Sequence, residues 1–144
     1  MKKTALIAAM VLAATTLTGA AVLPAAGDAT VYTKRLVSLD LESHSLGAHT
    51  FAGAAVDRHA GHVIGYDAFT GHFYPKQERA DIWVSYALRD GTISGVVHAN
   101  ASATVNTGRI LNGTGNYQGV RGTISARPAP HNGEKTFVTL TYHF

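Results

Sequence analysis

The sequence predicts an all-β fold, an antiparallel meander of seven or eight strands that closes into a barrel. Apolar and polar residues alternate repeatedly, no sustained apolar stripe recurs at helical spacing, and turn motifs separate the alternating segments. Closure into a barrel is expected because it removes the unpaired edges of a meander. The chain has 144 residues, of which 46% are hydrophobic, and this suits one domain with its own core.

Residues 1–26 are predicted to be a signal peptide. Lys2 and Lys3 precede an uncharged run rich in Ala, Leu and Val that extends to about Leu23, and small residues follow around Pro24. A cationic end, an apolar centre and small residues in this order are typical of export signals. The alternative is an uncleaved membrane anchor, since the run approaches spanning length. We expect a secreted or periplasmic protein without a stable membrane anchor after processing, although several alanines could mark the cut.

The clearest strand pattern extends from Thr92 to Val105, where Ile93, Gly95 and Val97 begin a small and apolar face. A strand of this length would cross a small domain from end to end, so a bend or bulge is expected. The other predicted strands, in chain order, are Val31–Leu41, His49–Val56, Val63–Ala68, Ile82–Leu88, Tyr117–Ala126 and Thr136–Phe144.

Turn chemistry separates these strands. Asp90-Gly91 is a strong signal for a tight turn. Pro128 and Pro130 would interrupt a central strand, so the segment around them is predicted to be a loop. The predicted loops are 57–61, 74–79, 89–91, 112–115 and 127–134.

Charge and cysteine content exclude several classes of protein. The formal net charge of +3 includes Lys2 and Lys3, and the only adjacent pair of cations in the rest of the chain is Lys34-Arg35. A nucleic-acid partner is not expected, because such binding needs clustered cations that displace phosphate counterions. The chain has no Cys, which excludes disulfides, a thiolate zinc site and a cysteine nucleophile.

The eight histidines raise the alternative of a metal site. His59, His62 and His72 form the best local group. Residues i and i+3 of a strand point to opposite faces, so His59 and His62 converge only if the turn at Gly61 brings them together. Solvent-facing loop histidines are the preferred interpretation, and no metal is expected.

The most informative segment is Leu111–Thr123, which reads Leu-Asn-Gly-Thr-Gly-Asn-Tyr-Gln-Gly-Val-Arg-Gly-Thr. It resembles the glycine-rich hairpin of the allene oxide cyclase-like and dirigent-like β-barrel superfamily. Gly113 and Gly115 can supply turn positions with positive φ. The segment 57–65 and the alternating aromatic end of the chain, 139–144, are weaker matches to the same superfamily.

The resemblance implies an eight-stranded antiparallel closed barrel of the calycin-like kind over residues 30–144, assembled as a homodimer or homotrimer. It also implies a lumen that holds a hydrophobic small molecule without a cofactor. Cyclases and dirigent proteins of this superfamily control cyclisation, isomerisation or stereoselective coupling by confining a reactive molecule near its product shape. The alternatives are a carrier barrel with no chemical step and, ranked behind it, a histidine-based metal-binding protein.

The resemblance also implies two catalytic residues. Asp40, on the polar phase of the first strand, lies near the position of a functional acid in plant cyclases, and Arg121 is the arginine of the glycine hairpin. The alternative roles are a surface carboxylate for Asp40 and a structural cation for Arg121. The predicted ligand-binding residues are Tyr66, Trp83, Tyr86 and Tyr117. Trp83 and Tyr86 lie on opposite phases of one strand, so only one of them is expected to face the lumen.

Three observations would separate these functions. Two ionisable groups with shifted pKa values inside one lumen would favour an enzyme. An apolar lumen without such groups would favour a carrier. Three converging histidines would favour metal handling.

Overall fold

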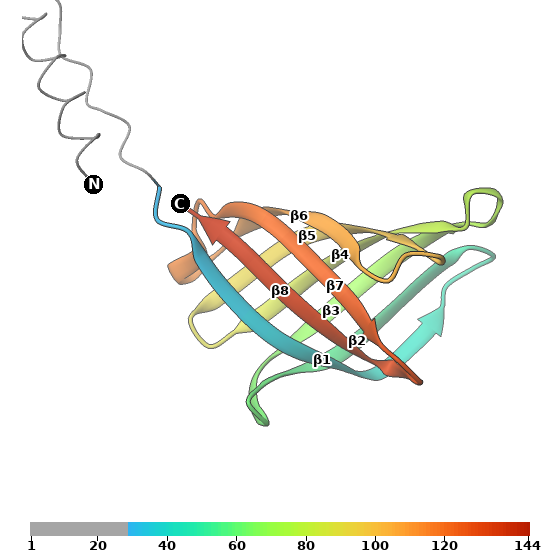
Figure 1. Cartoon of the computed structure of the whole chain (residues 1–144), viewed down its shortest axis with the longest axis horizontal. Helices are drawn as coiled ribbons and strands as arrows, with labels where there is room; N and C mark the ends of the chain where they lie inside the picture. The colour runs from blue at the N-terminus through green and yellow to red at the C-terminus, as the bar shows by residue number, and fades with distance from the viewer. Residues whose placement is uncertain (1–28) are drawn as a thin grey trace, which may run out of the picture.

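The computed structural model describes residues 29–144, which form a closed antiparallel barrel (Figure 1). The eight strands follow one another around the barrel in chain order, and the last pairs with the first. The predicted all-β, eight-stranded closed barrel is therefore confirmed. The predicted signal peptide, 1–26, lies outside the described residues. Between residues 29 and 144 there is no helix with the length and apolar character needed to span a bilayer.

Two short 3-10 turns interrupt the succession of strands, one after the third strand and one after the sixth. The elements are β1 (Tyr32–Ser45), β2 (Thr50–His59), β3 (His62–Tyr74), η1 (Pro75–Gln77), β4 (Arg79–Leu88), β5 (Gly91–Asn100), β6 (Asn106–Gly113), η2 (Gly115–Tyr117), β7 (Arg121–Ala129) and β8 (Asn132–His143).

The strand predicted from Thr92 to Val105 is too long, and the next strand, β6, was not predicted. β5 ends at Asn100 because side chains there form a local turn. The Asn100 Oδ1 atom accepts hydrogen bonds from the backbone nitrogen and the hydroxyl of Ser102, at 2.9 and 2.6 Å. The Asn106 Oδ1 atom accepts the backbone N–H of Asn100 at 3.0 Å. Bonds of this kind compete with the strand ladder and favour a turn.

The loop predicted at 127–134 is mostly strand. β7 continues to Ala129 and β8 begins at Asn132, so the reversal occupies only Pro130 and His131. Pro128 pairs with Thr136 immediately before a register shift. A proline is tolerated at such a bulge because the hydrogen-bond ladder is already irregular.

The interior of the barrel is packed at one end. The 3-10 turn η2 places Tyr117 and the following Val120 against the core there, and both are buried. They belong to one cluster of buried apolar residues, which includes Ile93, Ile110, Ile124, Leu140 and Tyr142. The barrel is thus closed with its own side chains where β1 begins and β8 ends, and a hollow remains toward the other end.

Candidate functional site

A pocket of about 290 Å³ lies inside the barrel. This volume is near the lower limit for small-molecule sites, which begin at about 300 Å³, so it suits a small ligand. Apolar and polar residues line it in similar numbers, and the apolar ones contribute more of its surface. The apolar lining residues are Phe51, Phe69, Ile82, Val84, Val97, Ala126 and Val138, and the polar ones are Ser38, Asp40, Ser43, Asp67, Tyr86 and Thr136.

Four consecutive strands supply a polar cluster at the floor of this pocket. Ser38 on β1 is paired with Asp57 on β2, and Asp67 on β3 is paired with Tyr86 on β4. All four residues are buried. Their side chains point inward because residues at alternate positions of a barrel strand face the interior. The Ser38 Oγ atom donates a hydrogen bond of 2.7 Å to the Oδ2 atom of Asp67.

The two aspartates of this cluster favour retention of a proton. Asp57 is fully buried, and neither of its carboxyl oxygens accepts a hydrogen bond from a donor group in the described part of the chain, so the neighbouring carboxyl group of Asp67 is the partner with which it can share a proton. Burial, followed by the negative charge of Asp67, raises the pKa of Asp57 to about 8. Burial also raises the pKa of Asp67, while the hydrogen bond from Ser38 acts in the opposite direction. The pair therefore keeps one proton at neutral pH and carries one negative charge.

Tyr86 is the aromatic residue of this cluster. Its pKa is raised by burial and then by the charges of Asp67 and Asp57, so its hydroxyl remains a neutral hydrogen-bond donor. Tyr86 lines the pocket. Trp83, on the same strand, is 46% exposed on the outside of the barrel. Of the two, only Tyr86 faces the lumen, as the alternation of the strand requires.

The other residues predicted to bind a ligand lie elsewhere. Tyr66 is 57% exposed and does not line the pocket. Tyr117 is buried at the packed end, where its ring lies 6.0 Å from that of Tyr142 and the Nζ atom of Lys34 lies 5.7 Å from its centre. Tyr117 thus closes the barrel, at the end opposite the hollow.

The two predicted catalytic residues are far apart in the barrel. Asp40 lines the pocket, next to a register shift between β1 and β2. Partial burial, then the charges of Asp67 and Glu134, raise the pKa of Asp40. Arg121 begins β7, is exposed, and donates a hydrogen bond of 2.7 Å from its Nη1 atom to the backbone oxygen of Val120. The structure therefore brings Asp40 to the pocket and leaves Arg121 outside its lining.

Sequence reasoning missed Ser38, Asp57 and Asp67. Asp57 was assigned to a hairpin loop, but it lies inside β2 and the turn is formed by Ala60 and Gly61. Asp67 had a detectable signal. Asp67 is two residues from Phe69, so both side chains lie on the same, inward face of the strand. A charged residue on an inward face is unusual, and this could have marked Asp67 as a candidate.

The histidine group proposed as a metal site does not assemble. His59 and His62 face each other across a turn, whereas His72 pairs with Thr50 at the far end of β3. The His72 ring lies 6.3 Å from the ring of His49. Within residues 29–144, no group of three or more His, Asp or Glu side chains is arranged to hold a metal ion.

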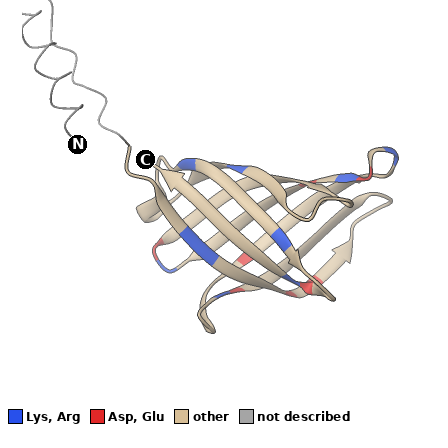
Figure 2. Cartoon of the chain, viewed as in Figure 1, with Lys and Arg blue, Asp and Glu red and all other residues tan. Residues whose placement is uncertain are grey.

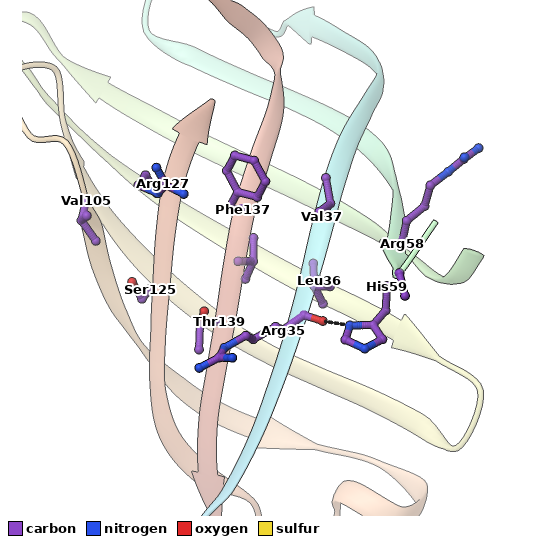
Figure 3. Close-up of a pocket in the computed structure, with 12 residues that line it drawn as sticks. Arg35, Leu36, Val37, Arg58, His59, Val105, Ser125, Arg127, Phe137 and Thr139 are labelled. Atoms are coloured by element: carbon purple, nitrogen blue, oxygen red, sulfur yellow. Dashed lines mark hydrogen bonds between the residues drawn. The ribbon is translucent and has the colours of Figure 1, made fainter. Parts of the chain in front are cut away.

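A second hollow, of about 330 Å³, lies on the outer surface against β1, β2, β7 and β8 (Figure 3). It carries Arg35, Arg58 and Arg127, and the Arg35 backbone oxygen is hydrogen-bonded to the Nδ1 atom of His59 at 2.7 Å. The Arg35 and Arg58 side chains extend away from each other in Figure 3. Its described lining includes no carboxyl group. The inner pocket, with its buried acids, is the better candidate for chemistry.

The class of protein is thus a closed eight-stranded barrel with a partly apolar, acidic lumen. Its fold is similar to that of dirigent proteins of known structure, and the barrel fold that the resemblance of Leu111–Thr123 implies is confirmed. No protein-family model matches the chain. A search of curated proteins found no match in sequence.

Three solved structures show the similarity. A pyocyanin demethylase superposes with a TM-score of 0.66 and 17% identity, over 77% of this chain and 99% of that protein. A pterocarpan synthase dirigent protein gives a TM-score of 0.59 and 12% identity, over 83% and 88% of the two chains. A Diels Alderase from Streptomyces koyangensis gives a TM-score of 0.57 and 18% identity, over 83% and 70%. Small-molecule chemistry is thus found on this fold.

Proposed function

We propose that this protein is an exported barrel enzyme that binds a small, largely apolar molecule in its lumen and moves a proton on it during cyclisation or isomerisation. The observation that carries the proposal is a buried pair of aspartates, Asp57 and Asp67, of which Asp67 lines a pocket with largely apolar walls. Two ionisable groups with raised pKa values in one lumen favour an enzyme over a carrier.

The geometry supports distinct roles for the two acids. Asp67 lines the pocket, so its carboxyl group can touch the ligand and act as the catalytic acid or base. Asp57 is buried without lining the pocket and acts through Asp67 by holding the shared proton. Two neighbouring carboxyl groups cannot both ionise easily, so a proton stays available at neutral pH.

Confinement supplies the rest of the rate enhancement. The apolar walls restrict a flexible ligand to few conformations, which lowers the entropic cost of ring closure. The Tyr86 hydroxyl can donate a hydrogen bond where charge develops on the ligand. The Diels Alderase and the pterocarpan synthase dirigent protein provide support by analogy, since their names describe the control of small-molecule chemistry on the same fold.

Export and self-association belong to this proposal as well. Residues 1–26 have the layout of a removable signal, and Edman sequencing of the protein recovered outside the host cytoplasm tests it. A mature chain that still begins at Met1 would contradict cleavage. A homodimer or homotrimer stays a prediction, which analytical ultracentrifugation of the full chain tests.

The enzymatic step is tested with an extract of small molecules from the host. The extract is incubated with the protein in deuterated water, and its compounds are resolved by chromatography and mass spectrometry. We expect one compound to be converted to an isomer that gains deuterium at carbon. Asp67→Asn is expected to abolish the conversion, and Asp90→Asn, in the exposed β4–β5 turn, to retain it. A compound that is retained by the barrel and never converted would support the carrier alternative instead.

A further inference from the structure

The lumen has an unbalanced charge. Two aspartates line it, Asp40 near the mouth and Asp67 deeper inside, Asp57 is buried beside Asp67, and the described lining includes no Lys or Arg. The inward-facing cation on β1 is Lys34, which lies over the ring of Tyr117 at the packed end. Elsewhere, Lys and Arg occur as separate short segments along the strands and turns (Figure 2). The hollow end of the barrel is therefore acidic inside.

The buried acids lack the partners that such groups normally have. Neither carboxyl oxygen of Asp57 accepts a hydrogen bond from a donor group in the described residues, although the residue is fully buried, and its polar neighbour is the carboxyl group of Asp67. Asp67 has the hydroxyl of Ser38 as a donor and no ion-pair partner in the described chain. Buried carboxyl groups are costly unless they are paired, so this arrangement fits a ligand that brings a positive charge.

Aromatic rings line the same pocket. Phe51 and Phe69 both contribute to its wall, with ring centroids 6.4 Å apart and planes at 63°. The faces of aromatic rings attract cations, and aromatic walls combined with acidic groups recognise organic ammonium ions. Toward the mouth, the charge of Glu134 acts on Asp40 and adds to the negative potential. A cationic ligand would therefore be attracted at the mouth and again at the floor.

We infer that the lumen binds an organic cation, a small and mostly apolar molecule with a positively charged nitrogen. This inference rests on the proposed function, because it takes the lumen as the binding site, and it names the substrate class. The apolar body would lie against the aromatic and aliphatic wall, and the nitrogen would lie toward Asp67. A carboxylate-bearing ligand of the same shape would be repelled. Cation binding would also favour the ionised pair and release its proton to solvent.

Three probes with the same two-ring body test the inference: N-methylquinolinium is cationic, 1-methylnaphthalene is neutral and 1-naphthoate is anionic. Binding to the full chain is measured by calorimetry and by NMR at neutral pH. We expect the cation to bind roughly tenfold more tightly than the neutral probe, a difference of about 1.4 kcal/mol, and the anion to bind most weakly. Titrations in buffers of different ionisation enthalpy are expected to show proton release with the cation alone.

Variants locate the effect. Asp67→Asn is expected to weaken the binding of the cation roughly tenfold. The affinity for the neutral probe is expected to stay the same, because the substitution removes only the attraction between a carboxylate and a positive charge. Asp90→Asn, on the exposed turn, is the matched control and is expected to change neither. Circular dichroism checks folding. If Asp67→Asn does not fold, Asp40→Asn at the accessible mouth gives the same test, with a smaller expected loss of cation affinity.

The outcomes separate this inference from the proposed function. Equal affinity for the cation and the neutral probe, both bound in the lumen, overturns the inference and leaves the proposed function standing. The lumen is blocked by Ala126→Phe or, if that variant is unstable, by Ser43→Trp, since both residues line the pocket. Probe binding that neither variant reduces places the site elsewhere and overturns the inference and the proposed function together.

Discussion

Ser38 and Asp67 are joined by a hydrogen bond of 2.7 Å across the interior of the barrel. Their strands, β1 and β3, are not neighbours, because β2 lies between them in the sheet. The bond therefore passes over the inner face of β2, where Asp57 stands. A hydroxyl donor stabilises the ionised form of Asp67, whereas Asp57 receives no such bond. The negative charge of the pair is thus held on Asp67, the acid that lines the pocket.

Removing the hydroxyl of Ser38 is expected to weaken this division of charge. Ser38→Ala is expected to raise the pKa of Asp67 further, because a bond that favours its ionised form is lost. The free energy of unfolding is expected to fall by about 1–3 kcal/mol, the usual cost of losing a buried hydrogen bond to a charged group. Carboxyl carbon NMR measures the titration, and urea denaturation at neutral pH measures stability.

The matched control is another serine pair on the outside of the barrel. The Oγ atoms of Ser85 and Ser94 lie 2.7 Å apart on the outer face, where Ser85 is exposed and Ser94 is half-buried. Ser85→Ala is expected to change stability by less than about 0.5 kcal/mol. Equal effects of Ser38→Ala and Ser85→Ala would contradict a special role for the interior bond.

The architecture could be predicted because its signal is local. Alternation along a strand and Asp-Gly turns depend on neighbouring residues, and a meander of such strands closes readily. The prediction failed where side chains override the pattern. The alternation continues past Asn100, yet the Asn100 and Asn106 amides form a turn there and begin a new strand. The prediction also failed at Pro128, which was expected in a loop. Pro128 remains part of β7 because it lies next to a bulge in the pairing with β8.

The site was harder to predict because it is assembled from four strands. Asp57 is close in sequence to a glycine turn, so local reasoning placed it in a loop. Its burial depends on how far β2 extends toward Gly61, which the pairing with β3 decides. Tyr86 and Asp40, which line the pocket, could be named as candidates because strand phase and family resemblance both apply to single strands. The partnership of Asp57 and Asp67 needs the register between strands, which the sequence alone does not contain.

Trp83 provides a test of which face of the barrel binds ligand. It is the only tryptophan in the chain and is 46% exposed on the outer face. A probe bound in the lumen is therefore expected to leave the quenching of Trp83 fluorescence by acrylamide unchanged. A reporter chain with Trp83→Phe and Phe69→Trp moves the fluorophore into the pocket wall, where the same probe is expected to protect it. Protection of Trp83 itself would point to binding on the outer face.

The glycine hairpin offers a matched pair of substitutions. Gly115 and Gly119 both have positive φ, at 60° and 83°. A Cβ atom at Gly115 would stand 2.5 Å from the backbone oxygen of Asp90, whereas a Cβ at Gly119 would meet nothing within 4 Å. Gly119→Ala is expected to cost about 1–2 kcal/mol from backbone strain alone. Gly115→Ala is expected to cost clearly more, because steric overlap is added to the strain.

Thermal and urea denaturation measure both glycine variants. The excess cost at Gly115 arises where η2 contacts the β4–β5 turn, since the Asn116 N–H donates to the Asp90 oxygen at 2.9 Å. Displacing this contact would loosen the cover that Tyr117 forms over the packed end. Equal destabilisation by the two alanines would show that backbone conformation, and not the close approach of the two turns, sets the requirement for glycine.

The pH dependence of stability tests the protonated state of Asp57. Its pKa is raised from 3.8 to about 8 by burial and by the charge of Asp67. Between these values the folded chain binds more protons than the unfolded chain, so the free energy of unfolding falls as pH rises. The contribution of Asp57 is therefore complete below its unfolded pKa and is lost as pH rises through the folded value. One such group gives a slope of at most about 1.4 kcal/mol per pH unit.

Asp57→Asn is expected to remove this contribution, because an amide does not titrate. Its stability relative to the wild type is expected to improve steadily as pH rises from about 4 toward about 8. Taking the difference between the two proteins cancels the titration of the histidines and the outer carboxylates, which both proteins share. Asp90→Asn is expected to run parallel to the wild type throughout. Parallel curves for Asp57→Asn and the wild type would mean that Asp57 has the same pKa in the folded and unfolded chain. Asp57 would then not be protonated at neutral pH, which would contradict a proton held by the Asp57–Asp67 pair.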